Sequence, residues 1–320
     1  MSETLEQFKE KRSEWIECLN SDDQHSIRNQ VIRLMWDSAV LRTTGAAIEL
    51  APRDEDGNPK LCGAIVNAFS RWGAASQSLA IRRLTEKYNP DRDKHQKKAV
   101  YSLHWLISDI LTNVALFTRE NLFAAEGLEC DISKVETAHR NWQQQKRREI
   151  HEIPAHLDSD GLAARHAFFN KIAGPKPRAT GEAGDVISSF LLNDLLAMLE
   201  KCKAVKGHVN KYIAHAATPE SLKHLDKKAA NLTYGEIWKA EKIICQVYSL
   251  LLKILCDVST SLVVLDMGNE FYYIENGWVS AEDAGKVREA GRAFKDETEG
   301  WLNWNGQALL KPASAAATAT

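Results

Sequence analysis

The chain has 320 residues, of which 44% are hydrophobic and 26% are charged. This is ordinary globular usage, so the composition excludes a chain that is disordered throughout or of low complexity. Its 41 Lys and Arg against 43 Asp and Glu give a net charge of −2, which excludes a global positive field that recruits nucleic acid. A phosphate-binding surface on this protein must therefore be local.

Residues 1–22 begin with MSETLEQFKEKRSEW, which predicts a charged helix and lacks the apolar core of a signal peptide. The most apolar stretch lies at 243–267. It contains Lys253 and Asp257 and has helical periodicity, which favours a buried core helix over a membrane span. Because Lys253 and Asp257 are four residues apart, they should share one edge of that helix.

All eight prolines lie between segments whose apolar residues are spaced by three and four, and none interrupts such a segment. This pattern predicts an all-α helical bundle. In chain order, the expected helices cover about 3–19, 23–50, 62–88, 95–124, 131–150, 160–172, 184–216, 233–266 and 280–297. Ser21, Asp22 and Asp23 form a natural N-cap cluster, and Thr233 with Glu236 has the spacing of a capping box.

We expect four parts along the chain: a charged helix over 1–22, a helical domain over 23–266, a C-terminal extension over 267–310 and a disordered tail over 311–320. The six cysteines are widely spaced, which disfavours both a zinc module and a disulfide scaffold. We expect buried thiols in a cytoplasmic protein that needs no metal and no other cofactor. His151 and His156 resemble a metal-ligand pair, but Pro154 between them favours a solvated loop.

The stretch KGHVNKYIAHAA at 206–217 combines histidine and lysine at helical spacing. One stripe of this helix, suited to the core, holds Cys202, Val205, Val209 and Tyr212. The neighbouring stripe holds His208, Lys211 and His215. Such a line of side chains predicts either a phosphate-binding site with a proton-transfer group, or a solvated polar flank.

The stretch VNKYIAHAA resembles the signature helix of HEPN domains, which are nucleotide-binding domains of higher eukaryotes and prokaryotes. It is most similar to their abortive-infection AbiU-like branch. SRWGAASQSLAIRRLTEKY and YSLHWLISDI resemble the first helical pair of that branch, and TYGEIWKAEKIICQVY resembles its closing helix. The resemblance covers about 65–265 and implies a HEPN-like helical bundle.

In the family an Arg is followed by four to six other residues and then by the His, and the Arg steadies the scissile phosphate while the His transfers protons. Counting back from His215, the corresponding positions are Asn210, Val209 and His208, and none is Arg. Lys211 or His208 would have to supply the charge, and Lys lacks the bidentate fork of Arg.

The resemblance implies RNA binding and metal-independent cleavage through the ribose 2′-hydroxyl, in phage defence or a toxin-type response. His215 would be the general acid and base, and Lys211, Asn210 and His208 would handle the phosphate. The resemblance also implies a homodimer and an antitoxin or another defence-system partner. The alternative is a catalytically inactive HEPN scaffold that binds a ligand or a partner protein.

Basic and aromatic residues elsewhere offer further RNA contacts. Arg71 and Arg82 are eleven residues apart and share a helix face, which is either a phosphate-contacting surface or a solvated face. Arg147 and Arg148 form a second basic group near a helix end. Trp301 and Trp304 are suited to stack on bases, or to pack a terminal segment onto the core, which is the more usual role of such a pair.

Overall fold

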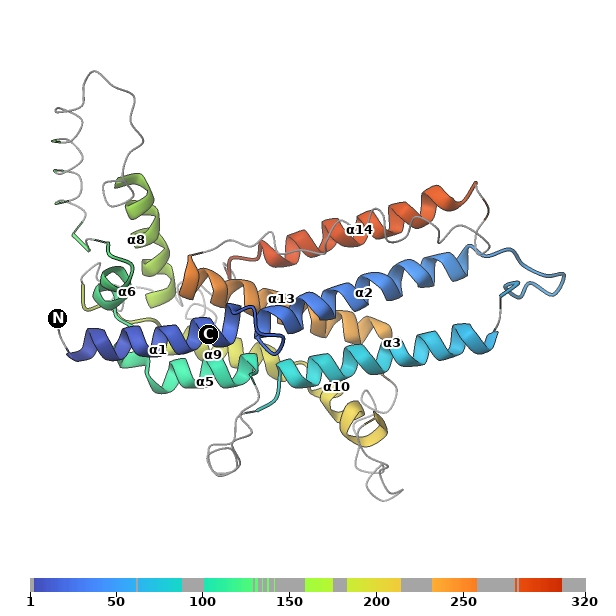
Figure 1. Ribbon diagram of the computed structural model, residues 1–320, viewed down its shortest axis with the longest axis horizontal. Helices are drawn as coiled ribbons and strands as arrows, with labels where there is room; N and C mark the ends of the chain where they lie inside the picture. Colours follow the sequence, from blue (N-terminus) through green and yellow to red (C-terminus); the bar gives the residue numbers. More distant parts are fainter. Residues whose placement is uncertain are drawn as a thin grey trace, which may run out of the picture. The chain divides into compact units, whose positions relative to one another are not determined.

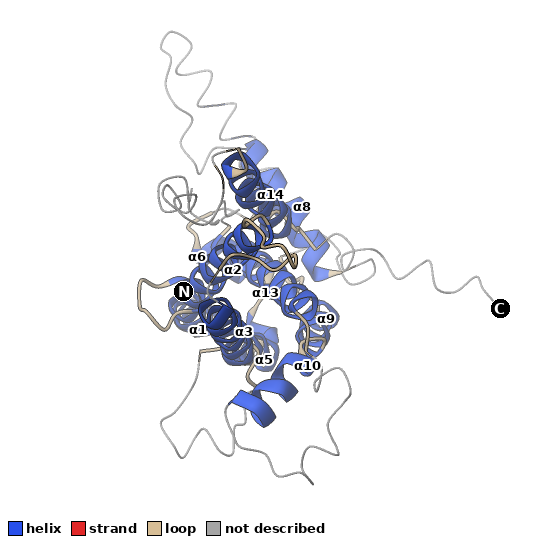
Figure 2. Cartoon of the chain, turned by 90° about the vertical axis from the view of Figure 1, so that its right-hand side faces the viewer, coloured by secondary structure: helices blue, strands red, loops and turns tan. Residues whose placement is uncertain are grey.

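The computed structural model describes residues 3–61, 63–87, 101–128, 130–131, 134, 137, 141, 159–174, 183–213, 232–257, 280 and 282–306 (Figure 1). These residues form helices joined by loops, with two isolated β-bridges and no strand (Figure 2). The all-α prediction is therefore confirmed. The expected helix at 131–150 lies almost entirely outside the described residues.

The helical elements agree with most of the predicted ranges, with the exceptions explained below. In chain order they are α1 (Glu3–Asn20), α2 (Ile27–Glu49), α3 (Gly63–Leu84), α5 (Leu103–Thr112), the 3₁₀ turn η1 (Val114–Leu116), α6 (Arg119–Ala125), α8 (Ser159–Ala173), α9 (Ser189–Glu200), α10 (Lys203–His208), the π-helical turn η3 (Val209–Ile213), α13 (Tyr234–Cys256) and α14 (Ala284–Leu302).

The chain divides into two compact units. The described residues of the first unit lie within 3–15 and 107–195 and at 306, and those of the second lie within 16–106 and 196–305. The division falls inside α1, α5 and α9. The domain limits expected from the sequence stay a prediction.

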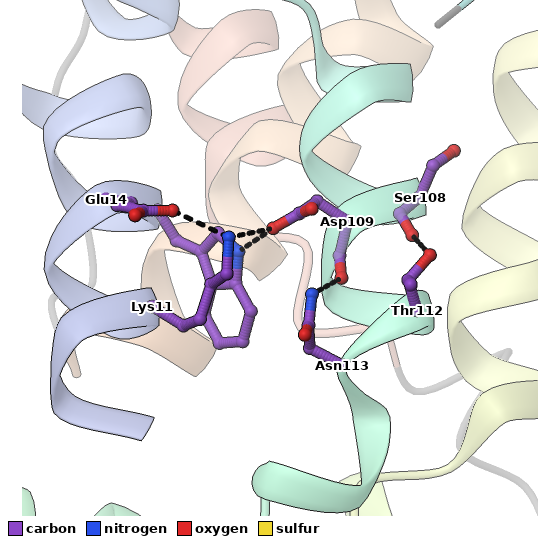
Figure 3. A network of polar contacts seen from close by, with 7 residues as sticks. Lys11, Glu14, Ser108, Asp109, Thr112 and Asn113 are labelled. Carbon is purple, nitrogen blue, oxygen red and sulfur yellow. Dashed lines mark hydrogen bonds and ion pairs between the residues drawn. The ribbon is translucent and has the colours of Figure 1, made fainter. Parts of the chain in front are cut away.

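The first unit anchors the beginning of α1 on α5 and on the segment that follows it. The rings of Phe8 and Trp15 contact Phe117, with centroids 5.3 and 5.9 Å apart. Trp15 Nε1 donates a hydrogen bond to Asp109 Oδ2 at 2.8 Å. Lys11 pairs with Glu14 at 2.8 Å and lies 3.6 Å from Asp109 (Figure 3). This segment is thus packed by its aromatic side chains and not only by its charges.

The single helix predicted over 95–124 is wrong, because the described part of this range, 101–124, holds α5, η1 and α6. Asn113 Nδ2 donates to the Asp109 carbonyl at 2.8 Å where α5 ends (Figure 3). Thr118 Oγ1 then caps α6 by accepting from Asn121 N at 3.1 Å. The backbone of this break pairs with a distant segment, since Arg119 N donates to the Asp185 carbonyl at 2.8 Å. Apolar spacing continues through the break, so periodicity alone does not reveal it.

In the second unit, α2 packs against α3, α13 and α14 (Figure 1). The helix α2 begins later than predicted, because Ser26, and not the Ser21–Asp23 cluster, supplies the N-cap: its Oγ accepts from Asn29 N at 3.3 Å. Gly73 of α3 permits the close approach of α2, since a Cβ there would lie 2.5 Å from Leu41 Cδ1.

The helix α13 is the buried core helix that the sequence predicts. Thr233 and Glu236 form the expected capping box. Ile244, Val247, Leu250, Leu251, Ile254 and Leu255 are buried, whereas Ile243 is half-buried. Lys253 and Asp257 form an ion pair at 2.5 Å on the expected shared edge. No helix within the described ranges has the length and apolarity that a lipid bilayer requires.

The predicted extension of this helix to 266 is wrong. The helix ends at Cys256, because Asp257 adopts the left-handed conformation with a φ of 53°. Val258 and the rest of the predicted extension lie outside the described residues.

Candidate functional site

The described part of the predicted helix over 184–216 contains three elements, α9, α10 and η3. The helix α9 starts at Ser189, and its last turn tightens at residues 201 and 202. There Lys201 N and Cys202 N bond to carbonyls three residues back, at 3.1 and 3.0 Å. A new helix, α10, then begins at Lys203. Burial raises the pKa of the Cys202 thiol to about 12, so this cysteine is inert as a nucleophile.

The NKxxAH stretch lies at the end of this region, and residues 209–213 form the π-helical turn η3. Its hydrogen bonds span five residues, so the turn is wider than that of an α-helix. Cys202, Val205 and Val209 are buried, as predicted. Tyr212 was expected in the same core stripe, but it is 46% exposed. The wide turn explains this error, because it breaks the α-helical register between Val209 and Tyr212.

The π-helical turn presents several polar groups to solvent. Asn210 is exposed, and Lys211 is half-buried. The ring of His208 lies against that of Tyr212, with centroids 4.9 Å apart and planes inclined by 31°. His215 lies outside the described residues, so its place relative to these groups stays a prediction.

Val209 occupies one of the three positions at which the HEPN pattern has its Arg. Its side chain is 0% exposed. The side chain of Val209 therefore packs in the core of the second unit and does not face solvent. A phosphate contact on this turn must come from its neighbours Asn210 and Lys211, or from His208.

Lys206 ties α10 to the end of α3, a contact that the sequence analysis missed. Its Nζ donates to the Thr85 carbonyl at 2.9 Å. The last carbonyls of a helix lack partners within the helix, and a lysine is a favourable partner for them. Burial lowers the pKa of Lys206, whereas the carboxylate of Glu200 raises it. In the sequence this residue cannot be distinguished from a solvated lysine.

Charged residues surround the Lys206 contact. Lys87 pairs with Glu200 at 3.0 Å. The pKa of His104 is lowered by burial first, and then by the positive charges of Lys206 and Lys87. His104 is therefore a neutral imidazole at pH 7. Sequence reasoning missed it, because the residues that set its charge come from three separate segments.

The predicted RNA-contacting arginines are placed differently. On α3, Arg71 is exposed, while Arg82 is half-buried and lies 3.6 Å from Glu86. Arg147 and Arg148 lie outside the described residues. Trp301 is 4% exposed, which agrees with the packing interpretation and not with base stacking.

The described residues contain no group of three or more His, Cys, Asp or Glu side chains placed to hold a metal ion. Comparisons of the chain with protein-family models, with curated proteins and with solved structures found no match.

Proposed function

We propose that this protein is a HEPN-like, RNA-binding endoribonuclease of a phage-defence or toxin-type response, which cleaves RNA without a metal ion. The observation that carries the proposal is the VNKYIAH segment, whose first five residues form a π-helical turn. Such turns are frequent at functional sites. This turn exposes an amide and an aromatic ring beside a half-buried lysine, close in sequence to His215.

The proposed chemistry needs one proton acceptor and a set of phosphate contacts. His215 takes the proton from a ribose 2′-hydroxyl, and the oxygen attacks the adjacent phosphorus. The bond from phosphorus to the 5′-oxygen of the next nucleotide breaks, and that oxygen receives the proton from His215. The products are a 2′,3′-cyclic phosphate and a 5′-hydroxyl. Lys211 neutralises the phosphate, and Asn210 and His208 donate hydrogen bonds to it.

Cleavage tests the proposal directly. The protein should cleave RNA in the presence of EDTA, and His215→Ala should lower the rate about 10²–10⁴-fold, the usual contribution of a general acid and base. The matched control is His25→Ala, which removes an exposed histidine from a turn before α2. Unchanged cleavage by His215→Ala, or loss of cleavage with EDTA, would contradict the proposal.

The catalytically inactive scaffold remains a second candidate, because a buried Val209 stands where the family pattern has one of its Arg positions. In that case the protein binds RNA or a partner without cleaving RNA. Binding of RNA by a protein that shows no cleavage, with weaker binding by Lys211→Ala and unchanged binding by Lys203→Ala, would favour this second candidate. In either case we propose a cytoplasmic homodimer with a defence-system or antitoxin partner.

A further inference from the structure

The side chain of Trp72 is 75% exposed, more than any other large hydrophobic side chain in the described ranges. Tryptophan usually contributes its large apolar surface to a core or to an interface. Trp72 instead lies in the middle of α3, which buries other positions against α2 and α13. A single exposed aromatic ring is not sufficient to indicate a ligand. The charges on the same helix provide the second observation.

The helix α3 carries three arginines and no Asp or Glu between Gly63 and Leu84. At 3.6 residues per turn, Trp72 and Arg83 lie within about 20° of each other around the helix, and about 16 Å apart along it. Arg71 and Arg82 are related in the same way and form a second row. Arg71 and Arg83 are both exposed.

Two acidic side chains lie near these rows, and each has a partner of its own. Asp37 accepts a hydrogen bond from Ser76 Oγ at 3.0 Å. Glu86 lies 3.6 Å from Arg82 Nε. Glu86 offsets the charge of Arg82, whereas the hydroxyl of Ser76 does not neutralise Asp37. The exposed Arg71 and Arg83 outnumber Asp37, so these side chains together give the surface around Trp72 a positive charge, although the whole protein has a net charge of −2.

An exposed aromatic ring with guanidinium groups on the same helix is suited to a nucleic acid strand with unpaired bases. Bases stack on such rings, and the cations follow the phosphates. A span of about 16 Å is long enough for these side chains to contact more than one phosphate of a strand. In a duplex the bases are stacked on one another, and proteins contact mainly the backbone. The arrangement on α3 therefore selects a single strand.

The helix that carries this surface also contacts the site proposed above. The turn η3 and the helix α10 both pack against α3 within the second unit. The hydrogen bond from Lys206 to the Thr85 carbonyl connects the end of α3 to α10. A strand bound along α3 would thus run over the helix against which the NKxxAH turn packs.

We propose that Trp72 stacks on an unpaired base of single-stranded RNA, while Arg71 and Arg83 neutralise the neighbouring phosphates. This inference rests on the proposed function, because it names the substrate class of the same site.

Binding of labelled oligonucleotides, followed by fluorescence anisotropy, tests the inference. A 15-nucleotide oligouridine should bind more tightly than a blunt RNA duplex of the same length. Trp72→Ala should weaken oligouridine binding about 5- to 150-fold, the range that stacking of one base supplies. Trp72→Phe should retain most of the affinity, because it keeps an aromatic face.

Two matched controls test whether the loss of any exposed aromatic ring or any exposed arginine weakens RNA binding. Phe190→Ala removes another exposed aromatic ring, which belongs to α9, and should leave binding unchanged. Arg292→Ala removes an exposed arginine from α14 and should have no effect, whereas Arg71→Ala should reduce the salt dependence of binding. Circular dichroism of each variant verifies that its helices are intact.

The outcomes distinguish this inference from the proposed function. If Trp72→Ala binds oligouridine as the wild type does, while Lys211→Ala binds weakly, the proposed stacking on Trp72 is wrong and the proposed function stands. If the wild type binds neither single-stranded nor duplex RNA, both are wrong. If Trp72→Ala alters the oligomeric state in sedimentation without altering RNA binding, the ring is a protein contact and the inference is overturned.

Discussion

Each unit contains an arginine within its helical packing, and the two arginines differ in how closely they approach a buried carboxyl group. In the first unit, Arg119 is 1% exposed. Its Nη2 lies 2.7 Å from Asp185 Oδ2 and 2.5 Å from Asn170 Oδ1, and its Nη1 lies 3.0 Å from His166 Nδ1. Burial and the charge of Arg119 lower the pKa of His166, so its neutral ring can accept this hydrogen bond.

In the second unit, the guanidinium of Arg42 lies over the rings of Trp238 and Phe294, 4.2 and 4.1 Å from their centroids. It pairs at 2.8 Å with Glu297, whose side chain is half exposed, but it remains 4.0 Å from the fully buried Glu241. Burial raises the pKa of Glu241 to about 8, although the hydrogen bond from Ser38 and the charge of Arg42 oppose this shift.

The comparison of Asp185 with Glu241 shows how close a guanidinium must be for a buried carboxyl group to remain ionised. A guanidinium at 2.7 Å compensates Asp185 for the loss of water through a charge-assisted hydrogen bond. At 4.0 Å the attraction is smaller than the cost of desolvation, so Glu241 is protonated at neutral pH. The first network is therefore an ionic anchor, whereas the second is sensitive to pH.

Asp185→Ala should have the largest effect. It leaves the buried guanidinium of Arg119 without its acidic partner, and breaking a buried pair in this way costs about 3–5 kcal/mol. The free energy of unfolding in urea should fall by this amount. Asp194→Ala, which removes an exposed aspartate of α9, should change it by less than about 0.5 kcal/mol. Equal effects of the two substitutions would contradict the role of Asp185 as an anchor.

Glu241→Gln should remove a pH dependence of stability. The folded state raises the pKa of Glu241 from 4.5 to about 8, so it binds this proton more tightly than the unfolded chain does. The stability from Glu241 is thus fully present below pH 4.5 and is lost as the pH rises to 8, by at most about 1.4 kcal/mol per pH unit. Over this range we expect a total loss of about 2–4 kcal/mol.

Chemical unfolding at several pH values measures this loss. Ser38 donates a hydrogen bond to Glu241, and the charged groups that act on it are Arg42 and Asp37 of α2 and Glu297 of α14. The substitution leaves all of these residues in place. Above pH 8 Glu241→Gln should be more stable than the wild type, and its profile should be flatter. Glu289→Gln, on the exposed side of α14, should retain the wild-type profile. If the stability of Glu241→Gln still falls with rising pH as that of the wild type does, groups other than Glu241 cause the pH dependence.

Val209→Arg should have the smallest of the three effects. It introduces a guanidinium at a buried position that holds an apolar side chain, whereas the guanidinium of Arg119 is paired with Asp185. We expect a loss of about 2 kcal/mol, because the neighbouring half-buried positions of η3 let the long side chain reach water. Asn210→Arg adds the same side chain at the next, exposed position and should be nearly neutral. If Val209→Arg is as stable as the wild type, the side chain of Val209 does not pack in the core.

The sequence alone determined the features of this protein that depend on residues close together in the chain. Proline placement and apolar spacing led to an all-α fold, and the ranges of α3 and α8 lie within a few residues of those predicted. The capping box at Thr233 and the ion pair between Lys253 and Asp257 could also be predicted. Each joins residues three or four apart, so local geometry is sufficient.

The candidate site was predicted only in part for the same reason. The sequence indicated the polar turn from His208 to Lys211 and the burial of Val209. It placed Tyr212 in the core, because a register of 3.6 residues per turn does not anticipate a π-helical turn. It also overlooked Lys206, His104 and Trp72, whose contacts or exposure depend on other helices.

Only the tertiary structure decided which distant groups meet. Ser38 and Glu241 are 203 residues apart in the chain, and Lys206 bonds to a carbonyl 121 residues away. The break before α6 likewise depends on the backbone at Asp185. Helix propensity and periodicity report the free energy of local conformations. The ionisation of Glu241 and the exposure of Trp72 are instead set by desolvation, which depends on what packs against each side chain.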